Sequence, residues 1–177
     1  MRAVVGLGNP GEDYAATRHN AGFLLADALA GHWQLPPFRR AERSRATEGT
    51  ANGVPVRLLK PTTFMNRSGA ALASLRADPS FDASRDLLIL VDDFQIPLGT
   101  FRLRAEGSAG GHNGLKSVEG ALQSQQYARL RIGVGPLPEG IGDWADYVLN
   151  PFEPEEREQV EALMPQMIEA VEQWLKR

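Results

Sequence analysis

The segment DLLILVDD, residues 86–93, decides the fold class of this 177-residue chain. Its unbroken apolar run, residues 87–91, is typical of a strand that is buried on both faces of a sheet. Strands of that kind occur mainly in α/β proteins, where helices cover both faces of a largely parallel sheet. The segment therefore predicts an α/β fold with this strand near the middle of the sheet.

The segments on either side alternate between strand and helix patterns. Strands are predicted over residues 2–8, 54–60, 99–104 and 129–135, and the turn-like ANG at 51–53 predicts a hairpin from about residue 43. Helices are predicted over residues 20–33, 65–77, 116–122 and 154–176. The alternation predicts a single globular domain of residues 1–177, with a twisted, mixed and mostly parallel central β-sheet surrounded by α-helices.

The composition excludes several kinds of protein. The chain contains no cysteine, which removes thiol catalysis, disulfides and thiolate metal sites. No apolar run approaches the ~20 residues that a membrane-spanning helix needs. The N-terminus also lacks the apolar core of a signal peptide. We therefore expect a cytoplasmic protein with no membrane partner.

Charge is distributed unevenly along the chain. The formal net charge is −3, but residues 1–138 carry 16 Lys and Arg against 12 Asp and Glu, whereas residues 139–177 carry 3 against 10. The acidity belongs to residues 139–177, so the rest of the chain can still present a basic surface to nucleic acid. One dense basic stretch fits either an RNA contact or a solvated loop, and it contains Arg39, Arg40, Arg43 and Arg45.

Polar clusters follow three of the predicted strands. GLGNPG (6–11), KPTTFMN (60–66) and the Asp92–Asp93 pair all stand at carboxyl ends. Parallel strands bring these ends to one edge of the sheet, where the sites of α/β proteins form. The loop that carries His19 is expected to return to the same edge. Because neighbours on a strand point to opposite faces, Asp93 is expected to point away when Asp92 points into the site.

His19 and Asp92 form the candidate catalytic pair. A carboxylate that holds one imidazole nitrogen sets the tautomer and stabilises the imidazolium, which makes the histidine a better base. Each residue also has an ordinary interpretation, His19 as a capping or half-buried histidine and Asp92 as part of a solvated strand end. Since the chain has no GxSxG serine and no cysteine, the pair is expected to activate water.

Three asparagines lie in the loops expected at this edge: Asn9, Asn66 and Asn113. Amide N–H groups can stabilise the oxyanion that forms during acyl hydrolysis. Asparagine is equally common in turns and helix caps, so each residue alone would indicate only a loop. Beside His19 and Asp92, the three amides favour hydrolysis of an acyl compound by water.

Other functions fit these residues less well. GLGNPG lacks the third glycine of a dinucleotide-binding loop, and the glycine-rich EGSAGGHNG (106–114) lacks the lysine of a P-loop. A metal-dependent hydrolase could use His19, Asp92 and His112, although no HxxxH spacing occurs. A non-catalytic RNA-binding protein that uses the basic residues is the second alternative.

The chain resembles the bacterial peptidyl-tRNA hydrolases, enzymes that cleave the ester between a peptide and tRNA. The similarity covers nearly the whole chain in the family's order, through VVGLGNPGEDYAATRHNAGF, LLKPTTFMNRSG, LVDDFQIPLGTFRLR, GSAGGHNGLKS, ARLRIGVGP and DYVLNPF. It implies a monomeric enzyme that uses neither metal nor cofactor. It also implies that the substrate is peptidyl-tRNA and that the reaction recycles tRNA released prematurely from ribosomes.

The resemblance also implies roles for individual residues. His19 would be the base, Asp92 its orienting partner and Asn113 a donor to the oxyanion. The substrate-binding residues would be Asn9, Tyr14, Met65, Asn66 and Asn113. Arg104 and Arg131 would bind tRNA phosphate, with Lys116 as a further candidate.

Two segments and one substitution complete the comparison with the family pattern. The glycine pair Gly110–Gly111 would shape the peptide channel, and residues 144–149 would form a mobile lid. Gln95 stands where the family commonly has an acidic residue. If that acid supports the site electrostatically, the tuning of this site would differ.

Overall fold

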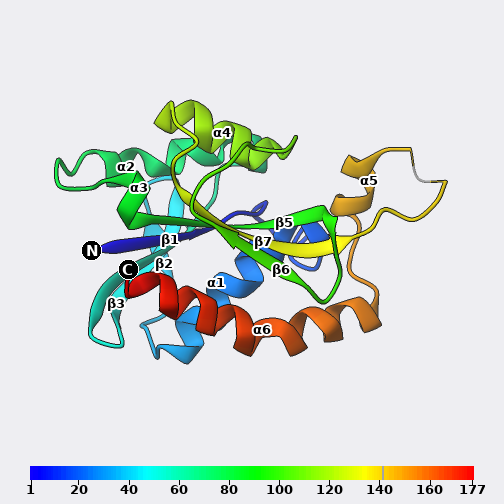
Figure 1. Cartoon of the computed structure of the whole chain (residues 1–177), viewed down its shortest axis with the longest axis horizontal. Coiled ribbons are helices and arrows are strands. Elements are labelled where there is room, and N and C mark those ends of the chain that lie inside the picture. The colour runs from blue at the N-terminus through cyan, green and yellow to red at the C-terminus, as the bar shows by residue number, and fades with distance from the viewer. Residues whose placement is uncertain (141) are drawn as a thin grey trace.

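The computed structural model describes residues 1–140 and 142–177, which form one seven-stranded mixed sheet in the order β2-β3-β4-β1-β5-β7-β6 (Figure 1). The strands are β1 (Arg2–Gly6), β2 (Arg39–Ala41), β3 (Ser44–Ala51), β4 (Val54–Pro61), β5 (Leu87–Pro97), β6 (Phe101–Arg104) and β7 (Ala128–Gly135). The central strands β4, β1, β5 and β7 are parallel, whereas β2, β3 and β6 pair antiparallel at the edges. The predicted α/β fold with a mixed sheet is confirmed.

Helices cover both faces of this sheet. They are η1 (Arg18–Asn20), α1 (Ala21–His32), η2 (Met65–Leu72), α2 (Ala73–Arg76), α3 (Ala83–Asp86), α4 (Asn113–Leu122), α5 (Trp144–Leu149) and α6 (Pro154–Leu175), where η marks a 3₁₀ helix. Figure 1 shows α1 and α6 on one face, α2 to α4 on the other, and α5 near one end of the sheet. No helix in the described part of the chain combines the length and apolar character needed to cross a membrane.

Strand β5 contributes to the core on both faces, as its apolar run predicts. Leu88 and Leu90 pack in the cluster beneath α1 and α6, whereas Leu87, Ile89 and Val91 pack in the cluster beneath η2 and α4. All five side chains are fully buried. The strand therefore carries Asp92 out of the core at the edge where β1 and β4 also end.

Several element boundaries differ from the predicted ones. The helix predicted over residues 65–77 is the 3₁₀ helix η2 followed by the short α2, and Arg67 interrupts the helical backbone. This segment packs closely on α4, because a side chain at Gly69 would collide with the backbone of Ser117. Strand β5 continues to Pro97, and β2, α3 and α5 were not predicted from the periodicity.

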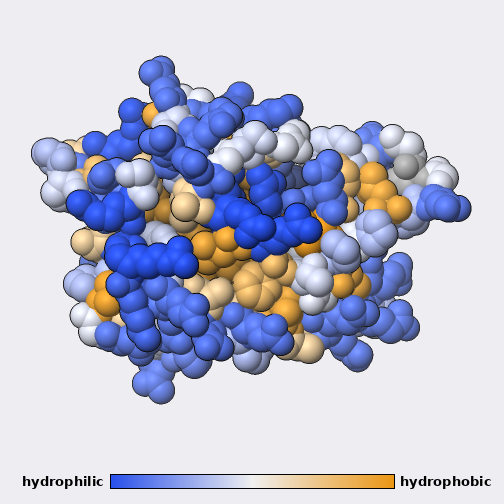
Figure 2. Space-filling view, viewed as in Figure 1, coloured by the Kyte–Doolittle hydropathy of each residue, from blue (hydrophilic) through white to orange (hydrophobic). Residues whose placement is uncertain are grey.

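Figure 2 shows polar side chains over most of one face, with an apolar area between β6 and α6. Phe101 and Leu103 of β6 and Met164 of α6 are partly buried there against the core. Edge strand β6 thus contributes apolar side chains to the core beside α6 in addition to its pairing with β7. Helix α6 begins with Glu153 and Glu156 forming a reciprocal capping box, which satisfies amides that would otherwise lack partners.

Candidate active site

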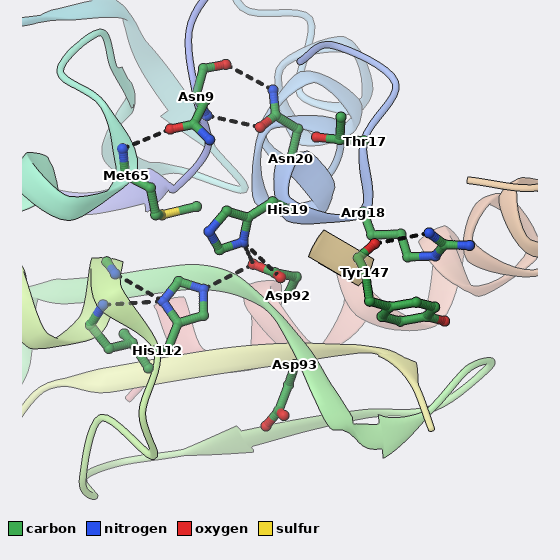
Figure 3. A network of polar contacts seen from close by, with 12 residues as sticks. Asn9, Thr17, Arg18, His19, Asn20, Met65, Asp92, Asp93, His112 and Tyr147 are labelled. Atoms are coloured by element: carbon green, nitrogen blue, oxygen red, sulfur yellow. Dashed lines mark hydrogen bonds and ion pairs between the residues drawn. The ribbon is translucent and has the colours of Figure 1, made fainter. Parts of the chain in front are cut away.

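His19 and Asp92 lie in direct contact at the carboxyl edge of the sheet (Figure 3). The Nδ1 atom of His19 in η1 is 2.9 Å from each carboxylate oxygen of Asp92 in β5. Both residues are buried, at 5% and 2% exposure. Burial at this level requires partners for both groups, and each is a partner of the other.

A second histidine binds the same carboxylate. The Nε2 atom of His112 is 2.9 Å from Oδ1 of Asp92. Its Nδ1 accepts hydrogen bonds from the amides of Gly114 and Leu115, in the first turn of α4. An imidazole nitrogen that accepts carries no proton, so Nε2 of His112 is the N–H that donates to Asp92.

Asp92 is therefore held as an anion between two imidazoles. Burial raises the pKa of the Asp92 carboxyl, but charge interaction and hydrogen bonding with His19 and His112 outweigh burial and lower it to about 2. An ionised carboxylate can only accept, so Nδ1 of His19 must donate to it. The remaining nitrogen of a neutral His19, Nε2, is then unprotonated and can act as a base.

The cleft beside His19 brings together polar groups from three other segments. Its walls are formed by Asn9, His19, Phe64, Met65, Asn66, Asn113, Trp144, Ala145, Val148 and Leu149, around about 200 Å³. Asn9 follows β1, Met65 and Asn66 begin η2, and Asn113 begins α4. The loops that follow the parallel strands thus meet at this edge, together with α5.

Asn9 is oriented by its own hydrogen bonds (Figure 3). Its Oδ1 accepts from the amide of Met65 at 2.7 Å, while its backbone exchanges two hydrogen bonds with the side chain of Asn20. The side-chain oxygen of Asn9 is therefore already hydrogen-bonded, and its NH₂ group is the donor that remains available to a ligand.

The other two asparagines are exposed at the cleft. Within residues 1–140 and 142–177, the side chains of Asn66 and Asn113 make no hydrogen bond to protein, so both are available to a ligand. Exposed apolar side chains also line the cleft, Phe64 before η2 and Leu149 at the end of α5. Tyr14 packs edge-on against Phe64, with ring centroids 6.2 Å apart, and therefore lies at the rim.

The three basic residues predicted to bind phosphate occupy different settings. Arg104 and Lys116 are exposed, and within residues 1–140 and 142–177 the guanidinium of Arg104 donates only to the carbonyl of Leu103. Arg131 is half-buried and already has protein partners, since it donates to Asp93 at 3.4 Å and to the carbonyl of Ser108 at 2.6 Å. Asp93 points away from His19, as the alternation along β5 predicts (Figure 3).

The glycine-rich loop that precedes His112 is tied to β7 by two arginines. Arg129 is 1% exposed and donates to the carbonyls of Ser108, Gln125 and Tyr127, while Arg131 shares the carbonyl of Ser108. Gly110 and Gly111 have positive φ values of 60° and 84°, which side chains disfavour. The loop thus enters α4 in a defined conformation that places His112 against Asp92.

Comparison with known proteins assigns the family. A family model described as peptidyl-tRNA hydrolase matches residues 3–177. The chain belongs to the peptidyl-tRNA hydrolase family. Peptidyl-tRNA hydrolases from Gemmatimonas aurantiaca and Chloroflexus aggregans are 45% and 46% identical to it, over 99% and 97% of this chain and 93% and 88% of theirs.

Solved peptidyl-tRNA hydrolases have the same fold. The crystal structure of the enzyme from Acinetobacter baumannii matches with a TM-score of 0.91 at 31% identity, over 99% of this chain and 89% of that one. The resemblance inferred from the sequence motifs is confirmed. Family membership does not by itself assign a role to any residue, so the roles of the cleft residues stay predictions.

Two features of this peptidyl-tRNA hydrolase site were missed in the sequence. His112 was considered only as a metal ligand, although its place at the start of a helix could have indicated a cap. Arg18 and Asn20, which flank His19, do not orient it directly: Arg18 binds α5 and α6, and Asn20 binds Asn9. Periodicity carries no signal for these pairings, which join segments far apart in the chain.

The metal-ligand alternative fits the geometry poorly. Ligand atoms of His19, Asp92 and His112 lie within 4.8 Å of one another, as a metal site would require. However, Nδ1 of His112 accepts two amide hydrogens, so its Nε2 carries the proton that a metal would have to replace. Hydrogen bonding accounts for the present arrangement of all three side chains.

Proposed function

We propose that this chain hydrolyses the ester that joins a peptide to the 3′-terminal ribose of tRNA, thereby recycling tRNA released prematurely from ribosomes. The observation that carries the proposal is the buried His19–Asp92 pair in a cleft lined by three asparagines. Membership of the peptidyl-tRNA hydrolase family supports the same substrate. Since peptidyl-tRNA is made on ribosomes, the proposal places the protein in the cytoplasm.

Water is the proposed nucleophile. Nε2 of His19 takes a proton from water, and the resulting hydroxide attacks the ester carbonyl carbon. Asp92 stabilises the imidazolium that forms, as it accepts from Nδ1. When the tetrahedral intermediate collapses, the ribose oxygen leaves and receives the same proton from His19, which restores the neutral base.

The three asparagines stabilise the oxyanion and bind the peptide. Asn113, assisted by the free NH₂ group of Asn9, donates to the oxyanion, and loss of one such donor typically costs about 10²–10³ in rate. Asn66 and Asn9 bind the peptide backbone, which every peptide possesses. A free aminoacyl ester lacks that amide and leaves polar groups unpaired, so it is rejected.

Phosphate binding is assigned to the basic residues near β6 and α4. Arg104 and Lys116 are exposed and free to meet phosphates. Arg131 adds positive charge while it holds Asp93 and the loop at Ser108. Contacts of this kind read the backbone and shape of RNA rather than its base sequence. We further infer that the protein acts as a monomer and without a metal ion.

Hydrolysis of an N-acetylated aminoacyl-tRNA, compared with its free-amine counterpart, tests the proposal. We expect the acetylated substrate to be preferred. His19→Ala should lower kcat at least about 10³-fold while tRNA binding persists, because the base is lost but not the basic surface. His32→Ala is the matched control, since His32 is an exposed histidine of α1 whose ring lies 3.9 Å from the carboxylate of Glu172.

Other outcomes would favour the alternatives. Activity that survives His19→Ala would contradict the proposed base, and tRNA binding without any hydrolysis by the wild type would favour the RNA-binding protein. Loss of activity on chelation, with recovery on addition of a metal, would favour the metal-dependent hydrolase.

A further inference from the structure

Arg18, the residue before His19, is buried and joins three elements. Its Nη1 donates to the carbonyl of Tyr147 in α5 at 2.9 Å, and its Nη2 donates to Oε1 of Glu156 in α6 at 2.7 Å. The guanidinium also lies over the Tyr147 ring, 4.1 Å from its centroid. Figure 3 shows Arg18 and Tyr147 on the side of Asp92 away from His112.

Tyr147 and Glu156 extend this contact to the sheet. The Tyr147 hydroxyl donates to the carbonyl of Val134 at the end of β7, at 2.7 Å, and lies 3.4 Å from Oε2 of Glu156. Glu156 also accepts from the amide of Glu153, which ties the ion pair to the start of α6. Arg18, Tyr147 and Glu156 thus form one connected group, here called the Arg18 cluster.

Backbone hydrogen bonds run alongside the Arg18 cluster. The amide of Arg18 donates to the carbonyl of Asn150 at 3.1 Å, and the amide of Phe152 donates to the carbonyl of Ala16 at 3.0 Å. Thr17 and Pro151 form an isolated antiparallel bridge between these bonds. The segment that leads into His19 is therefore joined to the segment that leaves α5.

The Arg18 cluster joins two parts of the chain that line the cleft. His19 follows Arg18 in η1, and Trp144, Val148 and Leu149 of α5 line the same cleft. The other end of α5 is held by Trp144, which stacks on Phe94 of β5 at 5.6 Å. The Arg18 side chain therefore links the segment of His19 to the middle of α5 and to the start of α6.

Stability alone does not account for a charged group at this place. Burying an ion pair costs desolvation energy, and apolar side chains of similar volume often stabilise a protein equally well. An arginine also fixes geometry, because its planar guanidinium donates hydrogen bonds to two acceptors at defined angles. Here the two acceptors belong to α5 and α6, and the residue that follows the arginine is the proposed base.

We propose that Arg18 is a positioning residue that, with Tyr147 and Glu156, sets the separation of α5 from His19 and thereby the affinity for the peptide part of the substrate. This inference rests on the proposed function. It assigns the Arg18 cluster to substrate binding and not to proton transfer, because within the described residues its side chains make no hydrogen bond or ion pair with the side chains of His19 or Asp92.

Glu156→Gln and Arg18→Lys test the proposal, because both keep side-chain volume while they weaken the ion pair or its fork geometry. With an N-acetylated aminoacyl-tRNA as substrate, we expect KM to rise about tenfold, as loss of a charge-assisted hydrogen bond implies. The value of kcat should stay within about twofold, and the midpoint of the pH–rate profile should not move. Glu161→Gln is the matched control, since it breaks an exposed ion pair with Arg157 in the same helix.

A measurement that needs no activity separates this inference from the proposed function. With 5-fluorotryptophan in the three tryptophan positions, the ¹⁹F resonance of Trp144 should shift in Glu156→Gln and Arg18→Lys, and should not shift in Glu161→Gln. An unchanged Trp144 resonance together with an unchanged KM would overturn the proposal. A fall in kcat with a displaced pH midpoint would also overturn it, since the Arg18 cluster would then act on His19.

Discussion

Asp92 binds two histidines, which differ in whether the ring nitrogen that does not contact Asp92 has a hydrogen-bond partner. His112 uses its Nδ1 to accept amide hydrogens at the start of α4, so it is fully committed. His19 uses only Nδ1 for Asp92, and the protein supplies no hydrogen-bond partner for its Nε2 within the described residues. The environment therefore separates a structural imidazole from one that can exchange a proton, although both bind the same carboxylate.

Replacing His112 by alanine should weaken catalysis without abolishing it. Asp92 would lose one of its two imidazole partners and α4 would lose the acceptor for two amides, while the His19–Asp92 contact would remain. We expect kcat to fall about 10- to 100-fold, which corresponds to one hydrogen bond to a charged group. Steady-state kinetics of both variants should show a smaller fall in kcat for His112→Ala than for His19→Ala. An equal fall in kcat in the two variants would contradict this prediction.

The lowered pKa of Asp92 predicts how stability responds to acid. A carboxyl with a pKa of about 2 in the folded protein and about 4 when unfolded favours the folded state above pH 4. That contribution, about 2.5 kcal/mol, is lost as the pH falls from 4 toward 2, when Asp92 becomes protonated.

Urea unfolding of the wild type and Asp92→Asn at pH 7, 4 and 2.5 measures this contribution. The variant should be less stable at pH 7 and should lose less stability between pH 4 and 2.5, because its amide does not titrate. Parallel losses in the two proteins would show that other carboxyl groups carry the acid sensitivity.

At the scale of elements, close packing of α1 on the sheet places His19. Gly22, in the first turn of α1, lies so near β1 and β5 that a side chain there would collide with the carbonyl oxygens of Leu7 and Leu90. The helix and the 3₁₀ turn before it can approach the strand ends only because position 22 has no Cβ. This approach brings His19 to Asp92.

Alanine at Gly22 should therefore be destabilising by at least about 1–3 kcal/mol, the range for overpacking a core, and should also lower activity because η1 moves. Gly31→Ala provides the control within the same helix. A side chain at position 31 meets nothing within 4 Å, so helix propensity should stabilise this variant by up to about 1 kcal/mol. Chemical denaturation compares the two, and equal stability changes would contradict the packing argument.

At the scale of the whole molecule, the charge asymmetry of the sequence becomes a spatial one. Seven of the ten acidic residues of the C-terminal segment lie in α6 or at its N-cap, on the face of the sheet shared with α1, whereas the exposed Arg104 and Lys116 belong to β6 and α4. Most of the acidic charge of this segment is thus placed on a different element from these two basic residues. The net charge of −3 averages over these regions and does not describe either one.

Binding of tRNA should weaken as salt rises, because neutralising phosphates releases counterions. We expect Arg104→Gln to weaken binding and to reduce the slope of log Kd against log salt by about 1. Arg157→Gln is the control, since Arg157 lies on α6 and pairs with Glu161. A salt slope that is the same in the wild type and Arg104→Gln would remove Arg104 from the phosphate contacts.

Local patterns were sufficient to predict the α/β class, the buried strand β5 and the presence of His19, Asp92 and three asparagines at one edge. Apolar periodicity and the parallel order of strands depend on neighbouring residues and on chain topology, so a sequence displays them directly. The irregular η2 helix, the short α5 and the third polar partner His112 could not be predicted in this way. Each involves contacts between elements that are separate in the chain, such as the close approach of Gly69 to α4.

The sequence by itself determined which chemical groups this protein possesses and which strand lies at its centre, because apolar runs, turns and residue types are local properties. Only the tertiary structure decided how those groups pair: Asp92 with two histidines, 73 and 20 residues away, and Arg18 with Tyr147 and Glu156, 129 and 138 residues away. Hydrogen bonds and ion pairs act over about 3 Å, so partners distant in the chain are chosen by the folding of the backbone that brings them together.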